Sequence, residues 1–393
     1  MHEESLIRRV KKLAEEYAFV QPFANYLKKY FQNHPEMGAR DRRETRDWSI
    51  HLLRIGKNLS ELSFEKRLGA ACFLCSNNLT PSLSYLIKTY TDFSESDIEK
   101  PVEEKAEMIS KKYSAFSLEK IFPMHHLLSP QIKRKEWFIS FLNKPKVWIR
   151  IRKIYREAVI KELNEKQILF IQDEDPLILS FPKVTALDNT NAYQNGYFEI
   201  QDKYSQLTRD FFYPGLNEYW WDACAGAGGK SLLLKEVEPT IKIFATDIRE
   251  NILRNYMERM KKSVYKFTET KVADLMHPIP GLHNEIFDGI IADVPCSGSG
   301  TWSRSPEWLQ KNIEQRLFDH YIPLQRNIIS SVLSSLKIGF PLIYITCSVF
   351  KKENEEVIDF ARQKFHLQVQ KMEVLKGYDQ KADTMFAASL IHG

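Results

Sequence analysis

Two cysteines in the C-terminal half of the chain each follow a run of apolar residues. Cys296 comes directly after FDGIIADVP, and Cys347 comes directly after LIYIT. Such runs are typical of buried strands in a parallel sheet, and an α/β sheet builds its binding sites where these strands end. A single cysteine is more often a buried core thiol than a reactive group. Two cysteines at two strand ends instead favour a chemical site.

A turn of small residues follows another apolar run. The run EYWWD ends at Asp222, and Lys230 opens an apolar helix. Glycines in such a turn let the backbone approach a ligand, and the N–H groups at a helix N-terminus favour a negative or polar group. The turn alone would suit a dinucleotide, a phosphate or S-adenosyl-L-methionine (AdoMet). It lacks the first glycine of the phosphate-loop pattern, because Cys224 stands there. The residues of the turn are Ala223, Cys224, Ala225, Gly226, Ala227, Gly228 and Gly229.

Acidic residues at successive strand ends narrow the choice of ligand. Asp247 ends KIFATD, about 20 residues after the glycine turn, where it can accept hydrogen bonds from ribose hydroxyls. Asp274 ends KVAD, where it can reach an adenine edge. Together with Asp222, these carboxylates would repel a pyrophosphate. The three residues therefore favour an adenosine ligand.

These motifs resemble those of the Sun/Fmu-type RNA cytosine-5 methyltransferases. The resemblance rests on DxCAxxGGK at 222–230, DxPCSGxG at 293–300 and TCS at 346–348 with ENE at 353–355. Gln201-Asp202 with Ser205 also resembles the segment before the first motif of that family. The match covers about residues 130–393. More weakly, ARDR at 39–42 resembles the NusB-like helical domain that some bacterial members carry.

The resemblance implies a role for each cysteine. Carbon 5 of cytosine is a poor nucleophile, and a thiolate that adds at carbon 6 makes it able to take a methyl group. By the resemblance, Cys347 is this nucleophile, and Cys296 helps to release the enzyme from the methylated base. Asp293 would hydrogen-bond or protonate nitrogen 3 of the ring and also lie near the cofactor. Lys230 and Arg304 are candidate cations that would favour the thiolate.

The resemblance also implies AdoMet as the cofactor. Its binding residues would be Cys224, Ala225, Gly226, Ala227, Gly228, Gly229 and Lys230 of the turn, together with Asp247, Asp274 and Asp293. The family has Pro where this chain has Ala227, and Ala where it has Gly226. These two departures predict a looser cofactor turn but remove no group that the reaction needs.

Alternating strands and helices position these residues. From about residue 205, strand-like runs alternate with helical stretches, which indicates a parallel sheet with crossover helices. We expect a Rossmann-like class I AdoMet methyltransferase domain of the α/β class, with a mostly parallel sheet, at residues 205–393. The predicted strands are Tyr219–Asp222, Ile241–Thr246, Lys271–Val272, Gly289–Ala292 and Leu342–Ile345.

The N-terminal third predicts a helical domain at residues 1–125, which the resemblance describes as NusB-like. Apolar residues recur at helical spacing in Leu6, Val10, Leu13, Tyr17 and Val20. Further helices are expected to begin after Gly38 and to run through FEKRLGAACFLCSN. The C-x-x-C pair in that run, Cys72 and Cys75, lacks the second ligand pair of a zinc site and the strand of a redox motif. We expect two buried helix cysteines and no metal.

Residues 131–160 are rich in Lys and Arg, with aromatic residues between them. Alternation over Val147–Ile151 predicts a strand, with Trp148, Arg150 and Arg152 on its second face. A cationic face with exposed aromatics would suit the phosphates and bases of RNA, although a solvated charged face over an ordinary core is equally open. We predict a small α/β RNA-binding segment at residues 126–204. The aromatic residues are Trp137, Phe138, Phe141, Trp148 and Tyr155.

The bulk composition excludes several classes of protein. A net charge of +5 permits a polyanionic partner without demanding one. Five cysteines imply no disulfide framework, and no apolar run is long enough for a membrane span. We expect a cytoplasmic monomer with no membrane contact.

The sequence therefore predicts an enzyme that forms 5-methylcytosine in RNA, with rRNA preferred because of the NusB-like resemblance. A tRNA methyltransferase stays open, as does a catalytically weak ribosome-assembly factor. Loss of Cys347 or Asp293 would have pointed to an assembly factor, but both are present. A small-molecule methyltransferase is disfavoured by the basic, aromatic segment, which a small substrate would not need.

Overall fold

The computed structural model describes residues 2–182, 186–263, 265, 269–277, 279, 286–311 and 313–392. The chain divides into two compact units, and each unit is built from separate stretches of sequence. The first contains residues 1–126, 133–145 and 301–313, and the second contains residues 127–132, 146–300 and 314–393. The division into domains at 1–125, 126–204 and 205–393 stays a prediction.

The first unit is helical, as its apolar spacing predicts. Leu6, Val10 and Leu13 are fully buried along the first helix. Val20 lies beyond the end of that helix and is 86% exposed, so its predicted place on the apolar face is wrong. No described helix is long and apolar enough to cross a membrane. The helices are α1 (His2–Glu16), α2 (Phe23–Gln32), α3 (Ala39–Arg54), α4 (Phe64–Cys75), α5 (Pro81–Tyr90), α6 (Val102–Lys112) and α7 (Arg134–Ser140).

The segment at residues 301–313 folds with these helices, although it follows the Cys296 motif in sequence. Trp302 is buried, and its ring centroid lies 5.6 Å from that of Phe122. The buried Arg54 guanidinium donates to the carbonyl oxygen of Ser303 at 3.0 Å. The Glu307 side chain accepts the backbone N–H of Phe23 at 3.0 Å, where α2 begins. The first unit therefore includes a piece of chain from the C-terminal half.

The second unit is built around a seven-stranded sheet with the order β10-β11-β9-β8-β5-β6-β7. The five predicted strands are confirmed, and they are parallel to one another. Two antiparallel strands at the C-terminus complete the sheet and were not predicted. The strands are β5 (Tyr219–Asp222), β6 (Lys242–Asp247), β7 (Glu269–Val272), β8 (Gly289–Asp293), β9 (Pro341–Thr346), β10 (Leu367–Leu375) and β11 (Met385–His392).

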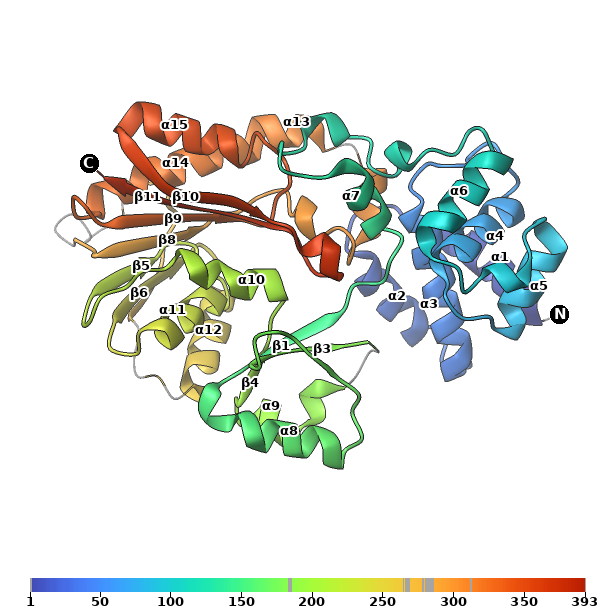
Figure 1. Cartoon of the computed structure of the whole chain (residues 1–393), viewed down its shortest axis with the longest axis horizontal. Coiled ribbons are helices and arrows are strands. Elements are labelled where there is room, and N and C mark those ends of the chain that lie inside the picture. Colours follow the sequence, from blue (N-terminus) through green and yellow to red (C-terminus); the bar gives the residue numbers. More distant parts are fainter. Residues whose placement is uncertain are drawn as a thin grey trace. The chain divides into compact units, whose positions relative to one another are not determined.

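Helices cover both faces of this sheet. Figure 1 shows α14 (Ile322–Val332) and α15 (Glu355–Phe365) on one face. The other face carries α10 (Lys203–Leu207), α11 (Gly229–Val237) and α12 (Glu250–Lys262). The parallel strands are buried on both faces of the sheet. Their sequences are therefore continuous apolar runs and do not alternate between apolar and polar residues.

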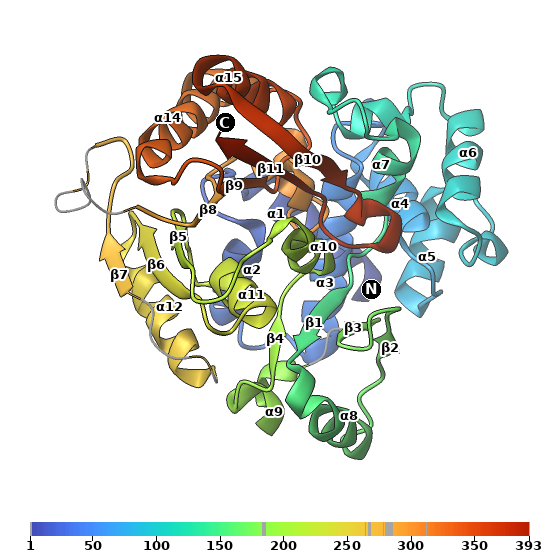
Figure 2. The same ribbon diagram turned by 60° about the vertical axis from the view of Figure 1, so that its left-hand side comes forward.

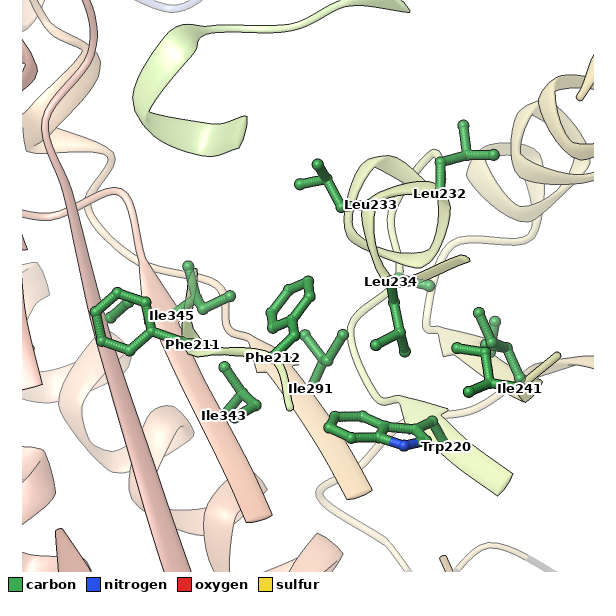
Figure 3. Close-up of a cluster of buried hydrophobic side chains, with 14 of the residues drawn as sticks. Phe211, Phe212, Trp220, Leu232, Leu233, Leu234, Ile241, Ile291, Ile343 and Ile345 are labelled. Atoms are coloured by element: carbon green, nitrogen blue, oxygen red, sulfur yellow. The ribbon is translucent and has the colours of Figure 1, made fainter. Parts of the chain in front are cut away.

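The core of this unit lies between the sheet and α11. Figure 3 shows Trp220 of β5, Ile291 of β8 and Ile343 of β9 lining one face of the sheet. Leu233 and Leu234 of α11 pack in the same cluster. Burial of such side chains contributes about 1.5–3 kcal/mol each. This cluster fixes α11, and with it the turn that precedes the helix, against the strand ends.

This unit also contains a small antiparallel sheet, with the order β2-β3-β1-β4. The predicted strand at Val147–Ile151 is confirmed as β1, which lies between β3 and β4 in Figure 2. The other strands are β2 (Ile171–Gln172), β3 (Ile178–Phe181) and β4 (Phe198–Ile200), and the helices beside them are α8 (Arg156–Glu165) and α9 (Asn191–Gln194).

The predicted cationic face of β1 is wrong. Arg150 is 0% exposed and Arg152 is 3% exposed. The Arg150 guanidinium pairs with Glu236 of α11 at 2.8 Å, and Arg152 pairs with Glu199 of β4 at 2.7 Å. Both arginines therefore face carboxylates inside the unit, since a buried charge needs a partner.

The aromatic residues of the basic segment are also mostly internal. Trp137, Phe138 and Phe141 are buried in the helical unit, and Trp148 is buried in the second unit. Tyr155 stacks on Tyr197, with ring centroids 4.0 Å apart. The prediction that the segment exposes aromatics for stacking on bases is therefore wrong for the four buried rings.

Candidate active site

A cavity of about 590 Å³ lies at the carboxyl ends of the parallel strands. Both predicted catalytic cysteines line it, and so do nearly all the residues predicted to bind the cofactor. Gly228 does not line the cavity. The predicted residues that do are Cys224, Ala225, Gly226, Ala227, Gly229, Lys230, Asp247, Asp274, Asp293, Cys296 and Cys347.

The turn before α11 follows the expected path, and two glycines make it possible. Gly226 and Gly228 have φ values of +52° and +85°, in the left-handed region that favours glycine. A Cβ atom on Gly228 would lie 2.7 Å from the Tyr256 ring, whereas a Cβ atom on Gly226 would meet nothing within 4 Å. Gly228 therefore packs against the protein, while Gly226 leaves open space at the cavity.

Asp247 holds the turn at the end of β6. Its carboxylate accepts the backbone N–H of Gly226 at 3.0 Å and pairs with the Arg249 guanidinium at 2.9 Å. Burial alone would raise the pKa of Asp247, but the hydrogen bonds from Arg249 and Gly226 lower it below its ordinary value. Asp247 is therefore ionised at neutral pH. The partner Arg249 was not predicted, although it stands only two residues away.

Asp222 lies behind the cavity and does not line it. The residue is fully buried, and its carboxyl group accepts the Ser231 hydroxyl at 2.6 Å. Burial raises the pKa of Asp222 to about 7. Of the three strand-end carboxylates, Asp222 therefore joins β5 to α11 from inside, whereas Asp247 and Asp274 line the cavity.

Lys230 and Asp293, which both line the cavity, form an ion pair. The Lys230 ammonium lies 3.4 Å from the Asp293 carboxylate and donates to the Ser205 hydroxyl at 2.6 Å. Gln201 donates to the same hydroxyl at 3.1 Å. The segment before the first motif thus lies beside Asp293, and Lys230 fixes the direction of that carboxylate.

The two cysteines lie in contact. The Cys296 and Cys347 sulfur atoms are 3.3 Å apart, and both residues are partly buried. The hydrogen bond with Cys347 raises the pKa of the Cys296 thiol, and burial raises it further. The Gly300 N–H donates to the carbonyl oxygen of Cys347 at 2.9 Å, which joins the two loops. Two thiols in contact at the wall of a cavity can act in turn on one bound group.

The helical unit carries two further cysteines. Cys72 and Cys75 lie in α4, where burial raises the pKa of both thiols. Within the ranges that the structure describes, no group of three or more His, Cys, Asp or Glu side chains could hold a metal ion.

Comparison with known proteins identifies the C-terminal part. Residues 211–390 match the family model of the 16S rRNA methyltransferase RsmB/F. The ribosomal RNA small subunit methyltransferase B of Escherichia coli O6:K15:H31 is 31% identical over 220 residues, which are 54% of this chain and 50% of that protein. The protein of the same name from Proteus mirabilis is 29% identical over 221 residues, or 55% and 51% of the two chains. The chain spans about half the length of these curated relatives.

Solved structures extend the likeness to the whole chain. The crystal structure of PH0851 has a TM-score of 0.70 at 20% identity, and the alignment covers 99% of this chain and 98% of that one. NSun6 from Pyrococcus horikoshii, solved with SFG, has a TM-score of 0.58 at 18% identity, with 66% and 94% covered. These likenesses show the fold and confirm the predicted α/β architecture, with a mostly parallel sheet and N-terminal helices. Residues 211–390 therefore match the RsmB/F family, and the resemblance to Sun/Fmu-type RNA methyltransferases is confirmed for this part of the chain.

Proposed function

We propose that this protein transfers a methyl group from AdoMet to carbon 5 of a cytosine in RNA. The observation that carries the proposal is the contact between the Cys296 and Cys347 sulfur atoms, 3.3 Å apart, at a cavity that also holds Asp293. Two thiols beside a carboxylate supply a nucleophile, a group for its release and a hydrogen-bonding partner for the ring.

The residues of the cavity fit AdoMet. The open space over Gly226 accepts a ligand, and Asp247 presents an ionised carboxylate to ribose hydroxyls. Asp274 and Leu275 line the same cavity, and we expect them to meet the adenine ring. AdoMet would supply an activated methyl group. The relative solved with SFG, an AdoMet analogue, has the same fold, which supports this choice of cofactor.

The proposed reaction uses each residue once. The Cys347 thiolate adds to carbon 6 of the cytosine, and the electrons of the 5,6 double bond move so that carbon 5 becomes nucleophilic. Asp293 binds nitrogen 3 and stabilises the altered ring. Carbon 5 takes the methyl group, and S-adenosylhomocysteine is the leaving group. The proton of carbon 5 then passes to the Cys296 sulfur acting as a base, the double bond re-forms, and the bond to Cys347 breaks so that its thiolate is regenerated. Cys296, in contact with Cys347, assists this release.

The proposed substrate is rRNA. The curated relatives carry the name ribosomal RNA small subunit methyltransferase B, and the family model is that of a 16S rRNA methyltransferase. A target base has to be unstacked or single-stranded to enter a cavity of this kind.

Bisulfite sequencing of rRNA and tRNA, after incubation with purified protein and AdoMet, tests the proposal. We expect a new 5-methylcytosine in small-subunit rRNA, and none when AdoMet is omitted. A methylated tRNA with unmodified rRNA would overturn the choice of substrate. Methylation at a nitrogen or at a ribose would overturn the reaction itself.

A further inference from the structure

Glu353 carries a fully buried carboxyl group beside the two cysteine loops. The residue is 0% exposed and stands two positions before α15. Among the described ion pairs, none joins Glu353 to a Lys, Arg or His side chain. Burial raises the pKa of this carboxyl group above its ordinary value. A carboxyl group removed from water in this way is costly unless hydrogen bonds replace the lost hydration.

Four hydrogen bonds to the Glu353 carboxyl group replace the lost hydration. They come from α14 and from the two cysteine loops, the segments after β8 and β9 that carry Cys296 and Cys347. One carboxyl oxygen, Oε1, accepts the backbone N–H of Ser297 at 2.8 Å and the Gln325 side-chain amide at 3.0 Å. The other, Oε2, accepts the Ser297 hydroxyl at 2.5 Å and the Ser348 hydroxyl. Ser297 directly follows Cys296, and Ser348 directly follows Cys347. A single carboxyl group therefore binds the residue after each thiol.

Other contacts of this cluster join the same two loops. The Ser299 and Ser348 hydroxyls lie 3.2 Å apart, and Ser299 accepts the backbone N–H of Val349 at 2.9 Å. Gln325 donates a second hydrogen bond, at 3.0 Å, to the carbonyl oxygen of Pro295. Every described hydrogen-bond partner of the Glu353 carboxyl group thus lies in a loop that carries a cysteine or, like Gln325, also bonds to one.

We propose that Glu353 is a positioning residue of the two-cysteine site, and that its carboxyl group sets the separation of the Cys296 and Cys347 sulfur atoms. The proposal rests on the proposed function. The carboxyl group does not touch the substrate; it acts through Ser297 and Ser348, which fix the backbone on either side of the contact between the thiols. Without it, the loops lose their shared acceptor, and the two thiols no longer face one bound base.

The charge of Glu353 gives this role a measurable consequence. After the hydrogen bond with Cys347, burial and the charge of Cys347 itself, the negative charge of Glu353 is a further cause of the raised pKa of Cys296. Removing that charge while keeping the shape of the side chain should therefore lower the pKa of Cys296. A residue that only fills space would have no such effect.

Two substitutions separate shape from charge. Glu353→Ala removes all the acceptors. Glu353→Gln keeps one oxygen for Ser297 N–H and Gln325, and its amide can donate to the serine hydroxyls, which rotate to accept. Glu355→Gln is the matched control, because Glu355 is a neighbouring carboxylate with a burial-raised pKa that accepts from Ser129 and from neither cysteine loop. Measurements on the full chain are kcat and KM with RNA, AdoMet affinity, and the pH dependence of iodoacetamide labelling of Cys296 and Cys347.

We expect Glu353→Ala to lower kcat by about 100-fold, the usual cost of misplacing reacting groups by about 1 Å, while AdoMet affinity and KM stay unchanged. Glu353→Gln should keep most of kcat and shift the labelling of Cys296 to lower pH. Glu355→Gln should match the unmodified protein in every measurement.

Wild-type kcat in Glu353→Ala would overturn the proposal, and so would an unshifted labelling profile in Glu353→Gln. If Glu353→Ala fails to fold, the proposal is tested by the pH dependence of Cys296 labelling in Glu353→Gln alone. Thiol labelling needs no RNA, so the positioning role can be judged even if the protein makes no 5-methylcytosine. The absence of that product would count against the proposed function only.

Discussion

The chain contains two cysteine pairs that share a residue type and little else. Cys72 and Cys75 lie one turn apart in α4 of the helical unit. Cys296 and Cys347 are 51 positions apart in sequence, but their sulfur atoms are 3.3 Å apart. The first pair is close because a helix is continuous, whereas the second is close because two neighbouring strands, β8 and β9, end at the same edge of a sheet.

The two cysteine pairs also differ in how buried they are and in what raises the pKa of their thiols. Cys72 is fully buried in α4, and burial is the largest cause of the raised pKa of both helix thiols. For Cys296, the largest cause is the hydrogen bond with Cys347, and both thiols line a cavity. Access to the cavity, and not the C-x-x-C spacing, therefore distinguishes the cysteines that can do chemistry.

The largest expected difference between the pairs is in catalysis at Cys347. Substituting Cys347→Ala removes the proposed nucleophile, and kcat should fall by at least about 10⁴-fold, as is usual for a covalent catalyst. AdoMet affinity should stay unchanged, because the turn at Gly226 and Asp247 is untouched. Methyl transfer from radiolabelled AdoMet and equilibrium dialysis measure the two quantities. Full activity in this variant would remove the distinction between the pairs.

Cys296→Ala tests the second member of the active pair. If Cys296 assists release, the Cys347–cytosine bond should form and then persist. A denaturing gel should show a slowly migrating protein–RNA species that is absent from Cys347→Ala and from the double variant. Multiple turnover should slow while the first methyl transfer still occurs. A gel without that species would leave Cys296 as a lining residue.

The helix pair should affect stability rather than activity. Cys72→Ser places a hydroxyl group where Cys72 is 0% exposed, and the free energy of unfolding should fall by about 1–3 kcal/mol. Urea denaturation measures this loss, with the less buried Cys75→Ser as the control for a smaller effect. The kcat of both variants should equal that of the unmodified protein. A large loss of kcat in a folded Cys72→Ser variant would contradict the assignment.

The edge of the sheet that carries the chemistry could be predicted from sequence, because buried parallel strands appear as continuous apolar runs and the reactive residues follow them directly. The same reasoning found Asp247 and the glycine turn. It could not find Glu353 as a shared acceptor, since its partners Ser297 and Gln325 come together only when α14 and the two loops are folded. Glu353 belongs to the ENE motif on which the family resemblance rests, but the motif does not show what its carboxyl group binds.

The burial of Arg150 was missed for a similar reason. Alternation along β1 shows that two faces differ, but it does not show whether the polar face meets water or a carboxylate. Glu236, the partner of Arg150, lies in α11 and far along the chain. Strand β10 is a different case, because LQVQKMEVL alternates apolar and polar residues over each half and could have been predicted as a strand. The alternation shifts by one residue where the pairing with β11 is irregular, between Val369 and Lys371.

The pH dependence of thiol labelling gives the smallest expected effect. It can be measured on the four thiols of the two pairs in one experiment. Burial raises the pKa of Cys75 to about 12, so this thiol should remain protonated and unlabelled in the folded protein at about pH 8, where free thiols begin to ionise. Unfolding restores an ordinary pKa, so the ionised thiol favours the unfolded state, and stability should fall as pH rises above about 8.5, the ordinary thiol value. Mass spectrometry after brief iodoacetamide treatment should find the label on Cys347, which lines the cavity, before Cys72 or Cys75, and in urea the difference should vanish. Equal labelling of both pairs in the folded protein would mean that α4 opens as readily as the cavity, and the contrast between a core pair and a chemical pair would then be lost.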